Sequence, residues 1–413
     1  MTLETFSTWE GTVDDLKGLV TERAISGETM LLNMGPQHPS THGVLRLILE
    51  LEGEEIVNCI PDVGFLHTGI EKNMEYKTYE KSIVMTDRMD YLNPMGNNLV
   101  YCLAMEKLFE LDVPIRAQIA RVILAELTRL NSHLVWLGIH GLDLGVTSMM
   151  TYCFREREVL LDIFEMVSGQ RMMSTYFRPG GLWRDLPEEF EDAVRFVLKT
   201  FPAKIDDYEK IMTHNAIFLD RTQGIGFITA EDAIAYGLSG PTLRASGVNW
   251  DIRKAQPYSS YERFEFDVPV GQHGDVYDRY LLRVEEMRQS LRIIEQGLNM
   301  LEPGPFRSNN RKYVPPPRSE LGRSMEAVIH HFKLWTEGFR PPKGEVYVAT
   351  ESPRGELGCF LASDGGPNPL RVHFRTPSFA NLSAANKLSQ GYMIADLVAI
   401  IGSIDIVLGD VDR

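Results

Sequence analysis

The chain has 413 residues, 44% of them hydrophobic and 24% charged, so it can bury a large core as one big domain or as two to three smaller ones. Its formal net charge of −15 argues against nucleic acid as a partner, because phosphate binding needs a basic surface. The four cysteines form no CxxC pair, so a disulfide framework, a cysteine zinc site or an iron–sulfur cluster held by this chain alone is not expected.

The sequence carries no pattern typical of export or membrane insertion. The N-terminal residues are acidic and have no apolar core, unlike a signal or transit peptide. The longest apolar stretch, Leu397 to Leu408, is shorter than the roughly 18 residues that a membrane span needs and is broken by Asp405. We therefore expect a chain that does not span a membrane and that folds in a reducing cytoplasm.

The first predicted elements surround a loop with two histidines. Residues 29–34 and 44–51 are expected to form a strand pair, because four leucines recur with period two and would bury one face. Between them lies the segment Gly-Pro-Gln-His-Pro-Ser-Thr-His-Gly, with His38 and His42 four residues apart. Pro39 pushes His38 out of the helical region, so this is not a metal pair on a helix. The imidazoles are held on an irregular loop, where binding and catalytic groups concentrate.

The middle of the chain is predicted to be helical. Apolar residues recur at three and four positions after Pro114, and Gly138 and Gly141 are expected to end that helix. Further helices are predicted over 99–108, near 149–168, from Glu188 to about Met212 with an interruption at Pro202, and over 276–300. Strand-like stretches at 345–350 and 369–375 flank a Gly-rich turn region, and a last helix runs near 381–401.

These patterns predict an α+β fold that is mainly α, with small β elements near both ends. We divide the chain into an N-terminal β-rich region with the histidine loop, residues 1–60, and a helical core with a C-terminal β/helix segment, residues 61–413. The two parts are expected to act as a single functional unit.

Two further residues attract attention beside the histidine loop. Tyr91 belongs to the segment Arg-Met-Asp-Tyr that precedes a predicted helix, so it would lie at the mouth of that helix. Asp143 follows the long helix in an apolar stretch, and a carboxylate there needs a partner if it is buried. A buried Asp commonly orients a histidine by accepting a ring N–H. His42 taken alone could equally be a histidine that satisfies loop backbone groups. There is no GxGxxG, P-loop or GxSxG motif.

Taken together, several segments resemble the D-subunit family of bacterial NADH–quinone oxidoreductase, respiratory complex I, the counterparts of the mitochondrial 49-kDa subunit. The resemblance covers essentially the whole chain. Its landmarks are GPQHPSTHGVLRL at 35–47, DRMDY at 87–91, RAQIARVILAELTRLNSH at 116–133, HGLDLG at 140–145, RPGG at 178–181, GQHGDVYDRYLLRVE at 271–285, ESPRGE at 351–356 and GSIDIVLGDVDR at 402–413.

The family shares its fold with the large subunit of [NiFe] hydrogenases, so the resemblance implies a hydrogenase-like helical core. Hydrogenases hold nickel with four thiolates. The matching positions here are Asp90 and Asn93, after Arg88, and Val407 and Asp410 near the C-terminus. Val and Asn cannot replace thiolate ligands, so no metal site is expected and a cavity remains where the metal would sit.

The resemblance implies that this cavity takes a quinone as substrate. Tyr91 and His42 match the residues that hydrogen-bond the quinone headgroup, and Asp143 matches the partner of the histidine. The other matched residues around the quinone and the neighbouring cluster are His38, Thr68, Arg88, Asp90, Met173, Arg178, Val407 and Asp410. Many relatives carry Arg at the position of Thr68 and His at that of Met173, so this chain lacks a charge and a titratable group there.

The resemblance also implies the partners. Electrons would come from the terminal [4Fe–4S] cluster of an adjacent B-type subunit, and this chain would hold no covalently bound cofactor. A C-type subunit, other peripheral-arm subunits and a membrane-arm subunit at the quinone entrance would be neighbours, on the cytoplasmic side of a bacterial inner membrane. Quinone reduction would be coupled to proton translocation. Two alternatives stay open: a hydrogenase-type large subunit, and a purely structural role in which the chain only docks the cluster-bearing subunit.

Overall fold

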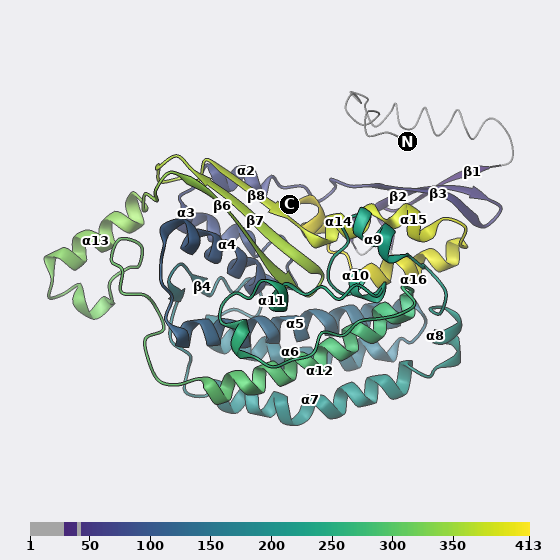
Figure 1. Cartoon of the computed structure of the whole chain (residues 1–413), viewed down its shortest axis with the longest axis horizontal. Coiled ribbons are helices and arrows are strands. Elements are labelled where there is room, and N and C mark those ends of the chain that lie inside the picture. The colour runs from purple at the N-terminus through teal and green to yellow at the C-terminus, as the bar shows by residue number, and fades with distance from the viewer. Residues whose placement is uncertain (1–28, 39–42) are drawn as a thin grey trace.

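The computed structural model describes residues 29–38 and 43–413, and these form an antiparallel sheet near each end around a helical core (Figure 1). The strands are β1 Met30–Met34, β2 Arg46–Glu52, β3 Glu55–Asp62, β4 Phe177–Arg178, β5 Gly181–Leu182, β6 Gly344–Ser352, β7 Gly355–Ser363 and β8 Arg371–Arg375. The longer helices are α4 Pro94–Phe109, α5 Ile115–Asp143, α6 Ser148–Ser168, α7 Phe190–Met212, α12 Val276–Met300, α13 Met325–Thr336 and α16 Ile394–Ile404. The short helices are α2 Ile70–Glu75, α3 Tyr79–Thr86, α8 Ala216–Asp220, α9 Ala230–Ala235, α10 Pro241–Ala245, α11 Ile252–Ala255, η3 Tyr261–Arg263, η4 Arg318–Glu320, α14 Pro377–Ser383, α15 Ala385–Ser389 and α17 Leu408–Asp412.

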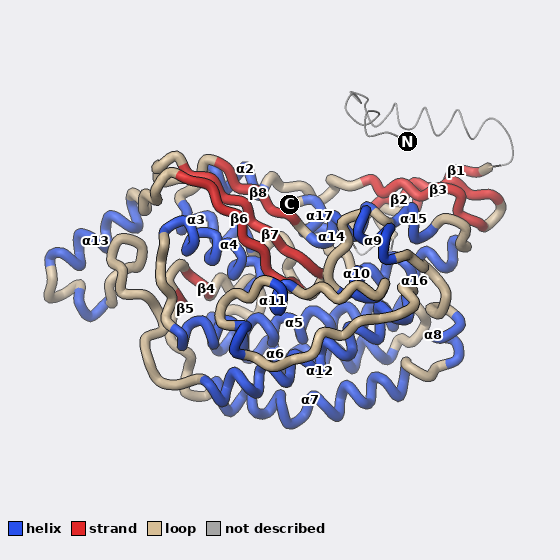
Figure 2. Tube along the Cα trace, viewed as in Figure 1, coloured by secondary structure: helices blue, strands red, loops and turns tan. Residues whose placement is uncertain are grey.

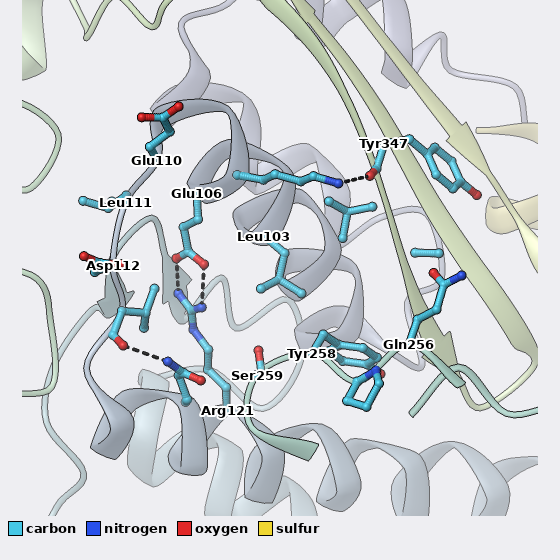
Figure 3. Close-up of a pocket in the computed structure, with 16 residues that line it drawn as sticks. Leu103, Glu106, Glu110, Leu111, Asp112, Arg121, Gln256, Tyr258, Ser259 and Tyr347 are labelled. Carbon is cyan, nitrogen blue, oxygen red and sulfur yellow. Dashed lines mark hydrogen bonds and ion pairs between the residues drawn. The ribbon is translucent and has the colours of Figure 1, made fainter. Parts of the chain in front are cut away.

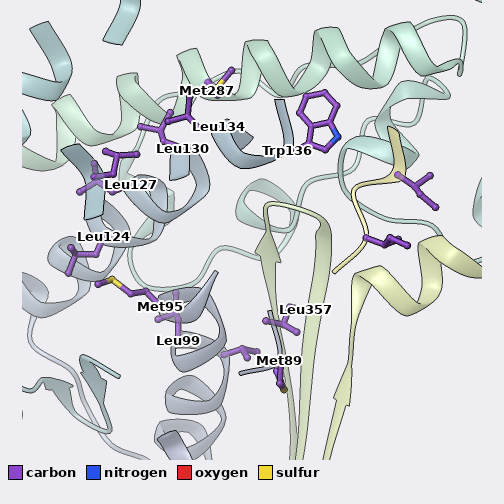
Figure 4. Packing of buried hydrophobic residues seen from close by; sticks show 14 of the residues in the cluster. Met89, Met95, Leu99, Leu124, Leu127, Leu130, Leu134, Trp136, Met287 and Leu357 are labelled. Atoms are coloured by element: carbon purple, nitrogen blue, oxygen red, sulfur yellow. The ribbon is translucent and has the colours of Figure 1, made fainter. Parts of the chain in front are cut away.

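Helix α5 is the centre of the core. It packs against α4, α6, α12 and α16, so most of its surface is buried rather than one stripe. Leu124, Leu127, Leu130 and Leu134 of α5 and Met287 of α12 all belong to the apolar interior between the helices (Figure 4). This packing holds the ends of α4 and α5 in place, and Tyr91 and Asp143 lie beside these ends.

The predicted end of the long helix at Gly138 and Gly141 was wrong, because α5 continues to Asp143. Both glycines lie where α6 crosses α5. A Cβ on Gly141 would lie 2.9 Å from Cβ of Met149, and one on Gly138 would lie 3.3 Å from Cα of Met150. These glycines therefore allow the two helices to pack closely. In a sequence, a glycine at a helix–helix contact cannot be distinguished from a glycine that ends a helix.

The predicted interruption of the next long helix at Pro202 was also wrong. Helix α7 runs through Pro202 without a break. Pro202 is exposed, so the backbone carbonyl that loses its partner one turn earlier can bond water. The helices predicted near 149–168 and over 276–300 are confirmed as α6 and α12.

The C-terminal sheet contains a strand that the sequence pattern did not predict. The predicted strands correspond to β6 and β8, and β7 lies between them in an antiparallel order β6-β7-β8. β7 is buried along almost its whole length, so it lacks the alternation of a half-exposed strand. The single helix predicted near 381–401 is instead three helices, α14, α15 and α16. Gly391, in the left-handed region at φ 82°, lies in the turn between the last two.

The N-terminal strand pair is confirmed, and β3 extends it to a three-stranded sheet. The leucines at positions 45, 47, 49 and 51 are all buried, as their period predicted. α15 packs on β3, so the C-terminal helices cover this sheet. Figure 2 shows both three-stranded sheets above a layer of long helices, which confirms a mainly α fold with small β elements near both ends. The likeness to hydrogenases stays a prediction.

Candidate functional site

Three buried carboxylates and one arginine gather where four chain segments meet. Asp90 precedes α4, Arg354 lies in the turn between β6 and β7, Asp405 caps the end of α16, and Asp410 lies in α17. All four side chains are at least nine-tenths buried. We call Asp90, Arg354, Asp405 and Asp410 the carboxylate cluster.

Arg354 is the hub of the carboxylate cluster. One terminal nitrogen, Nη1, lies 2.6 Å from Oδ2 of Asp90 and donates to the Ser132 hydroxyl of α5 at 3.0 Å. Nη2 lies 3.2 Å from Oδ1 of Asp405, and Nε donates to the Asp405 backbone carbonyl at 2.9 Å. The guanidinium therefore joins the turn after β6 to α5, to the end of α16 and to the residue before Tyr91.

The local backbone explains why these side chains converge. The amide of Asn97 in α4 donates to the Asp90 carbonyl at 2.9 Å, and Oδ1 of Asp90 accepts the Leu92 N–H at 3.1 Å, so the Asp90 loop is fixed to its helix. Gly355 has φ 135°, and a Cβ at Gly240 would overlap the Cα of Gly355. Only glycines allow this close approach, which sets the turn that presents Arg354.

Charge is unevenly balanced in the carboxylate cluster, because it contains three carboxylates and one guanidinium. Burial, with the nearby charge of Asp90, raises the pKa of Asp410 to about 6, and the Ser378 hydrogen bonds and Arg354 oppose this only in part. Burial likewise raises the pKa of Asp405, against the lowering effect of Arg354 and Arg283. The cluster therefore holds a carboxyl that can carry a proton near neutral pH.

Tyr91 lies beside this cluster and is half-buried. Burial raises the pKa of its phenol, the negative charges of Asp90 and Asp405 raise it further, and Arg354 opposes them. The environment keeps Tyr91 a neutral phenol, which is a hydrogen-bond donor with a proton to give.

His42, the predicted partner of Asp143, lies outside the described residues. Asp143 is the last residue of α5 rather than a loop residue beyond it. Burial raises its pKa to about 6, while the charge of His38 lowers it. The first histidine of the loop is thus close enough to Asp143 to act on it, although 105 positions separate them in the sequence.

The structure brings Asp90 and Asp410 together, with Val407 buried nearby on the segment that leads into α17. The Val407 N–H and the Asp410 carboxylate both bond Ser378, at 3.4 and 3.1 Å. Among the described residues no group of three or more His, Cys, Asp or Glu side chains is arranged to hold a metal ion. Oδ2 of Asp90 instead forms an ion pair with Arg354.

The other predicted residues lie outside the carboxylate cluster. Arg88 is exposed and donates to the Val84 carbonyl of α3. Thr68 is also exposed, and its N–H donates to the carbonyl of Arg413 at 3.4 Å. Arg178 lies 3.4 Å from Glu80 and over the ring of Trp183.

Met173 adopts φ 55° in a segment that contacts the loop before Tyr91. The N–H of Thr175 donates to Oδ2 of Asp87 at 3.1 Å, and the Thr175 hydroxyl bonds the same oxygen. Burial raises the pKa of Asp87 to about 6, against these hydrogen bonds and that from Asn98. The Asp87 carboxyl is therefore a buried titratable group in contact with the segment of Met173.

Sequence reasoning did not single out Arg354 and Asp405 as site residues. Arg354 stands in the landmark ESPRGE, between Pro353 and Gly355, and Asp405 interrupts an apolar stretch of the sequence. A charged residue inside an otherwise apolar stretch was the available signal, since a buried charge needs a partner.

Comparisons with known proteins match one family over most of the chain. A family model described as "Respiratory-chain NADH dehydrogenase, 49 Kd subunit" matches residues 143–413. The chain is 60% identical over 399 residues to a D subunit of NADH-quinone oxidoreductase from Chloroflexus aurantiacus, covering 95% of this chain and 97% of the relative. It is 57% identical over 388 residues to the D subunit of NADH-quinone oxidoreductase from Geotalea uraniireducens, covering 94% of this chain and 100% of the relative. Within the described residues, no helix has the length and apolar character to cross a membrane.

Proposed function

The chain belongs to the 49-kDa-subunit family of respiratory-chain NADH dehydrogenase, the D subunits of NADH–quinone oxidoreductase, and on this premise we propose that it provides the quinone-reducing site of its complex. Tyr91 and His42 donate to the two carbonyl oxygens of the quinone headgroup, and Asp143 orients His42. The observation that carries the proposal is the placement of Tyr91 beside the buried carboxylate cluster, which keeps its phenol protonated.

Reduction of a quinone to a quinol consumes two electrons and two protons. A phenol and an imidazolium can each hydrogen-bond one carbonyl oxygen and pass a proton to it as the electrons arrive. An ionised Asp143 favours the charged, donating form of the neighbouring histidine. The electrons come from the terminal [4Fe–4S] cluster of an adjacent B-type subunit, so this chain's residues supply binding, orientation and protons.

The proposal extends to the setting of the chain. The chain lies peripherally on the cytoplasmic side of the bacterial inner membrane. Its neighbours there are the cluster-bearing subunit, a C-type subunit and the membrane-arm subunit at the quinone entrance. Proton loss from Tyr91 and His42 changes the partner of Asp143, and this change in charge starts the coupling to proton translocation.

Replacement of Tyr91 by Phe in the assembled complex tests the proposal. The substitution removes the hydroxyl alone, so NADH:quinone reductase activity should fall by about 10²-fold, the lower range for the loss of a general acid. NADH oxidation by ferricyanide should stay unchanged, because it draws electrons upstream of quinone. Tyr236→Phe, at an exposed tyrosine, is the matched control. Full quinone reductase activity in assembled Tyr91→Phe enzyme would instead support a purely structural role for the chain.

A further inference from the structure

A cavity lies away from the carboxylate cluster. It has a volume of about 570 Å³ and lies between the end of α4, the start of α5, the loop 256–259 and the outer side of β6 (Figure 3). None of the residues of the carboxylate cluster lines it. Its walls are aliphatic in part, from Leu103, Leu111, Val113 and Val348, and carry backbone and side-chain polar groups.

One wall of this cavity is an open edge of a β-sheet. β6 pairs with β7 on one side and ends the order β6-β7-β8. In an antiparallel ladder, alternate residues point both backbone groups away from the partner strand. The Tyr347 carbonyl accepts a hydrogen bond from Lys107 at 3.1 Å, and the Glu351 N–H donates to the Tyr258 hydroxyl at 3.0 Å, so residues of this parity point away from β7.

Ala349 lies between Tyr347 and Glu351 and shares their orientation. Its N–H and carbonyl therefore face the cavity, as does the N–H of Tyr347. Within residues 29–38 and 43–413, no side chain or loop backbone bonds these groups. An edge strand with exposed, unpaired backbone groups is a template for pairing with another chain, so this short stretch of β6 can accept an added strand.

The loop 256–259 holds another unpaired polar group. The Ser259 hydroxyl is buried and has no hydrogen-bond partner among the described residues. Figure 3 shows it pointing from its loop into the interior, between Arg121 and Leu103. Ser259 and Ser260 both have positive φ, 46° and 69°, a conformation that non-glycine residues rarely adopt. Strained backbone of this kind is typical of binding sites.

The charges around the cavity indicate what it binds. Arg121 neutralises Glu106 inside the cavity, with Nη2 2.6 Å from Oε1. Glu110 and Asp112 are exposed at the rim, and no described cation forms an ion pair with either of them. A ligand with a basic group beside these carboxylates would complement the site.

We infer that this cavity is a β-augmentation site, in which an extended segment of another subunit of the complex pairs its backbone with Tyr347 and Ala349 and places a lysine or arginine beside Glu110 and Asp112. The chain is a subunit of a multi-subunit enzyme, so protein partners are at hand. Its own residues 1–28 fit poorly, because they carry six carboxylates against two basic side chains. A segment from another subunit satisfies the edge strand and the rim charges together.

Hydrogen exchange in the purified, assembled enzyme tests the pairing without any substitution. The amides of Val346 and Val348 bond β7 and should exchange slowly in any case. If a strand is added, the amides of Tyr347 and Ala349 should exchange as slowly as these two. Exchange of Tyr347 and Ala349 at the rate of an open edge in the assembled enzyme would overturn the inference.

A photo-crosslink identifies the occupant. With p-benzoylphenylalanine in place of the exposed Gln256, irradiation of the purified complex should attach one peptide from another subunit, and that peptide should contain a lysine or arginine. Crosslinks only to residues 1–28 of this chain, to a second copy, to a lipid or to nothing would each contradict the inference. Neither readout depends on quinone reduction.

Two proline substitutions on the edge strand β6 form a test variant and its matched control. Ala349→Pro removes an N–H that faces the cavity and leaves the ladder to β7 intact. It should abolish the crosslink and restore fast exchange at Tyr347. Glu345→Pro removes an outward N–H of the same strand beyond the cavity, and should change neither. Equal effects of the two substitutions, or an undiminished crosslink in Ala349→Pro, would contradict the pairing.

Discussion

Nη1 of Arg354 lies 2.6 Å from Oδ2 of Asp90, so a residue in the turn after β6 is paired with the residue directly before Tyr91, although 264 positions separate the two in the sequence. Both side chains are almost completely buried. The orientation of the proposed proton donor is therefore set by an ion pair that joins two distant parts of the fold.

Removing this arginine should be strongly destabilising. Arg354→Met removes the ion-pair partner of the buried carboxylates of Asp90 and Asp405, and the loss of one partner of a buried pair costs about 3–5 kcal/mol. The free energy of unfolding of the full chain, measured by chemical denaturation, checks this. Arg354→Lys keeps the charge but not the bidentate geometry and should recover part of the loss.

The control for that prediction is Arg195→Ala, because Arg195 forms an exposed pair with Glu191 on α7. Its loss should change the free energy of unfolding by no more than about 0.5 kcal/mol. Equal effects at Arg195 and Arg354 would show that burial does not determine the contribution of the Arg354 pair.

The raised pKa of Asp410 makes stability depend on pH. Its pKa is about 6 in the folded chain, above its ordinary value of 3.8, so the folded state holds an extra proton between these values. The contribution of Asp410 to stability is therefore fully present below about pH 4 and is lost as the pH rises through about 6. Asp410→Asn cannot titrate, so the stability of this variant relative to the native chain should increase from pH 4 to pH 7. A constant difference across this range would contradict the raised pKa.

Asp143 should act on quinone reduction through its charge. Asp143→Asn keeps the shape of the side chain but cannot hold His42 in its charged form, so quinone reductase activity should fall while ferricyanide reduction continues. Because the pKa of Asp143 is about 6, activity of the native enzyme should decline as the pH falls below that value, and the variant should lack this decline. Equal quinone turnover by the variant and the native enzyme at all pH values would remove Asp143 from the mechanism.

If the proposed electron donor, a [4Fe–4S] cluster of an adjacent subunit, lies beside Met173, its potential should depend little on pH, because a thioether has no proton to exchange. Asp87 contacts the segment of Met173 through Thr175. Its raised pKa makes it a group that could exchange a proton there in place of a histidine. An EPR-monitored redox titration over roughly pH 6 to 8 should give a small slope, which Asp87→Asn removes. A slope of about 60 mV per pH unit that persists in Asp87→Asn would show proton coupling from another source.

The sequence predicted the features that depend on local periodicity. The alternating leucines of β2 identified its buried face, and the apolar repeat after Pro114 identified α5. It misread residues whose role depends on a distant neighbour. Gly141 resembled a helix end because the close contact with Met149 of α6 is not visible in the sequence. Likewise, Asp90 and Asp410 were expected at one site from the family resemblance, whereas Arg354, which joins Asp90 to that site, was not foreseen.

A structure of the assembled complex with quinone bound tests the central claim most directly. We expect the Tyr91 hydroxyl and a ring nitrogen of His42 at about 2.8 Å from opposite carbonyl oxygens of the headgroup, which separates the two side chains by roughly 6–10 Å. Asp143 should then accept a hydrogen bond from the other ring nitrogen of His42. A headgroup bound away from Tyr91, or the two side chains more than about twice that distance apart, would contradict the role of Tyr91 and His42 as the two donors to the quinone.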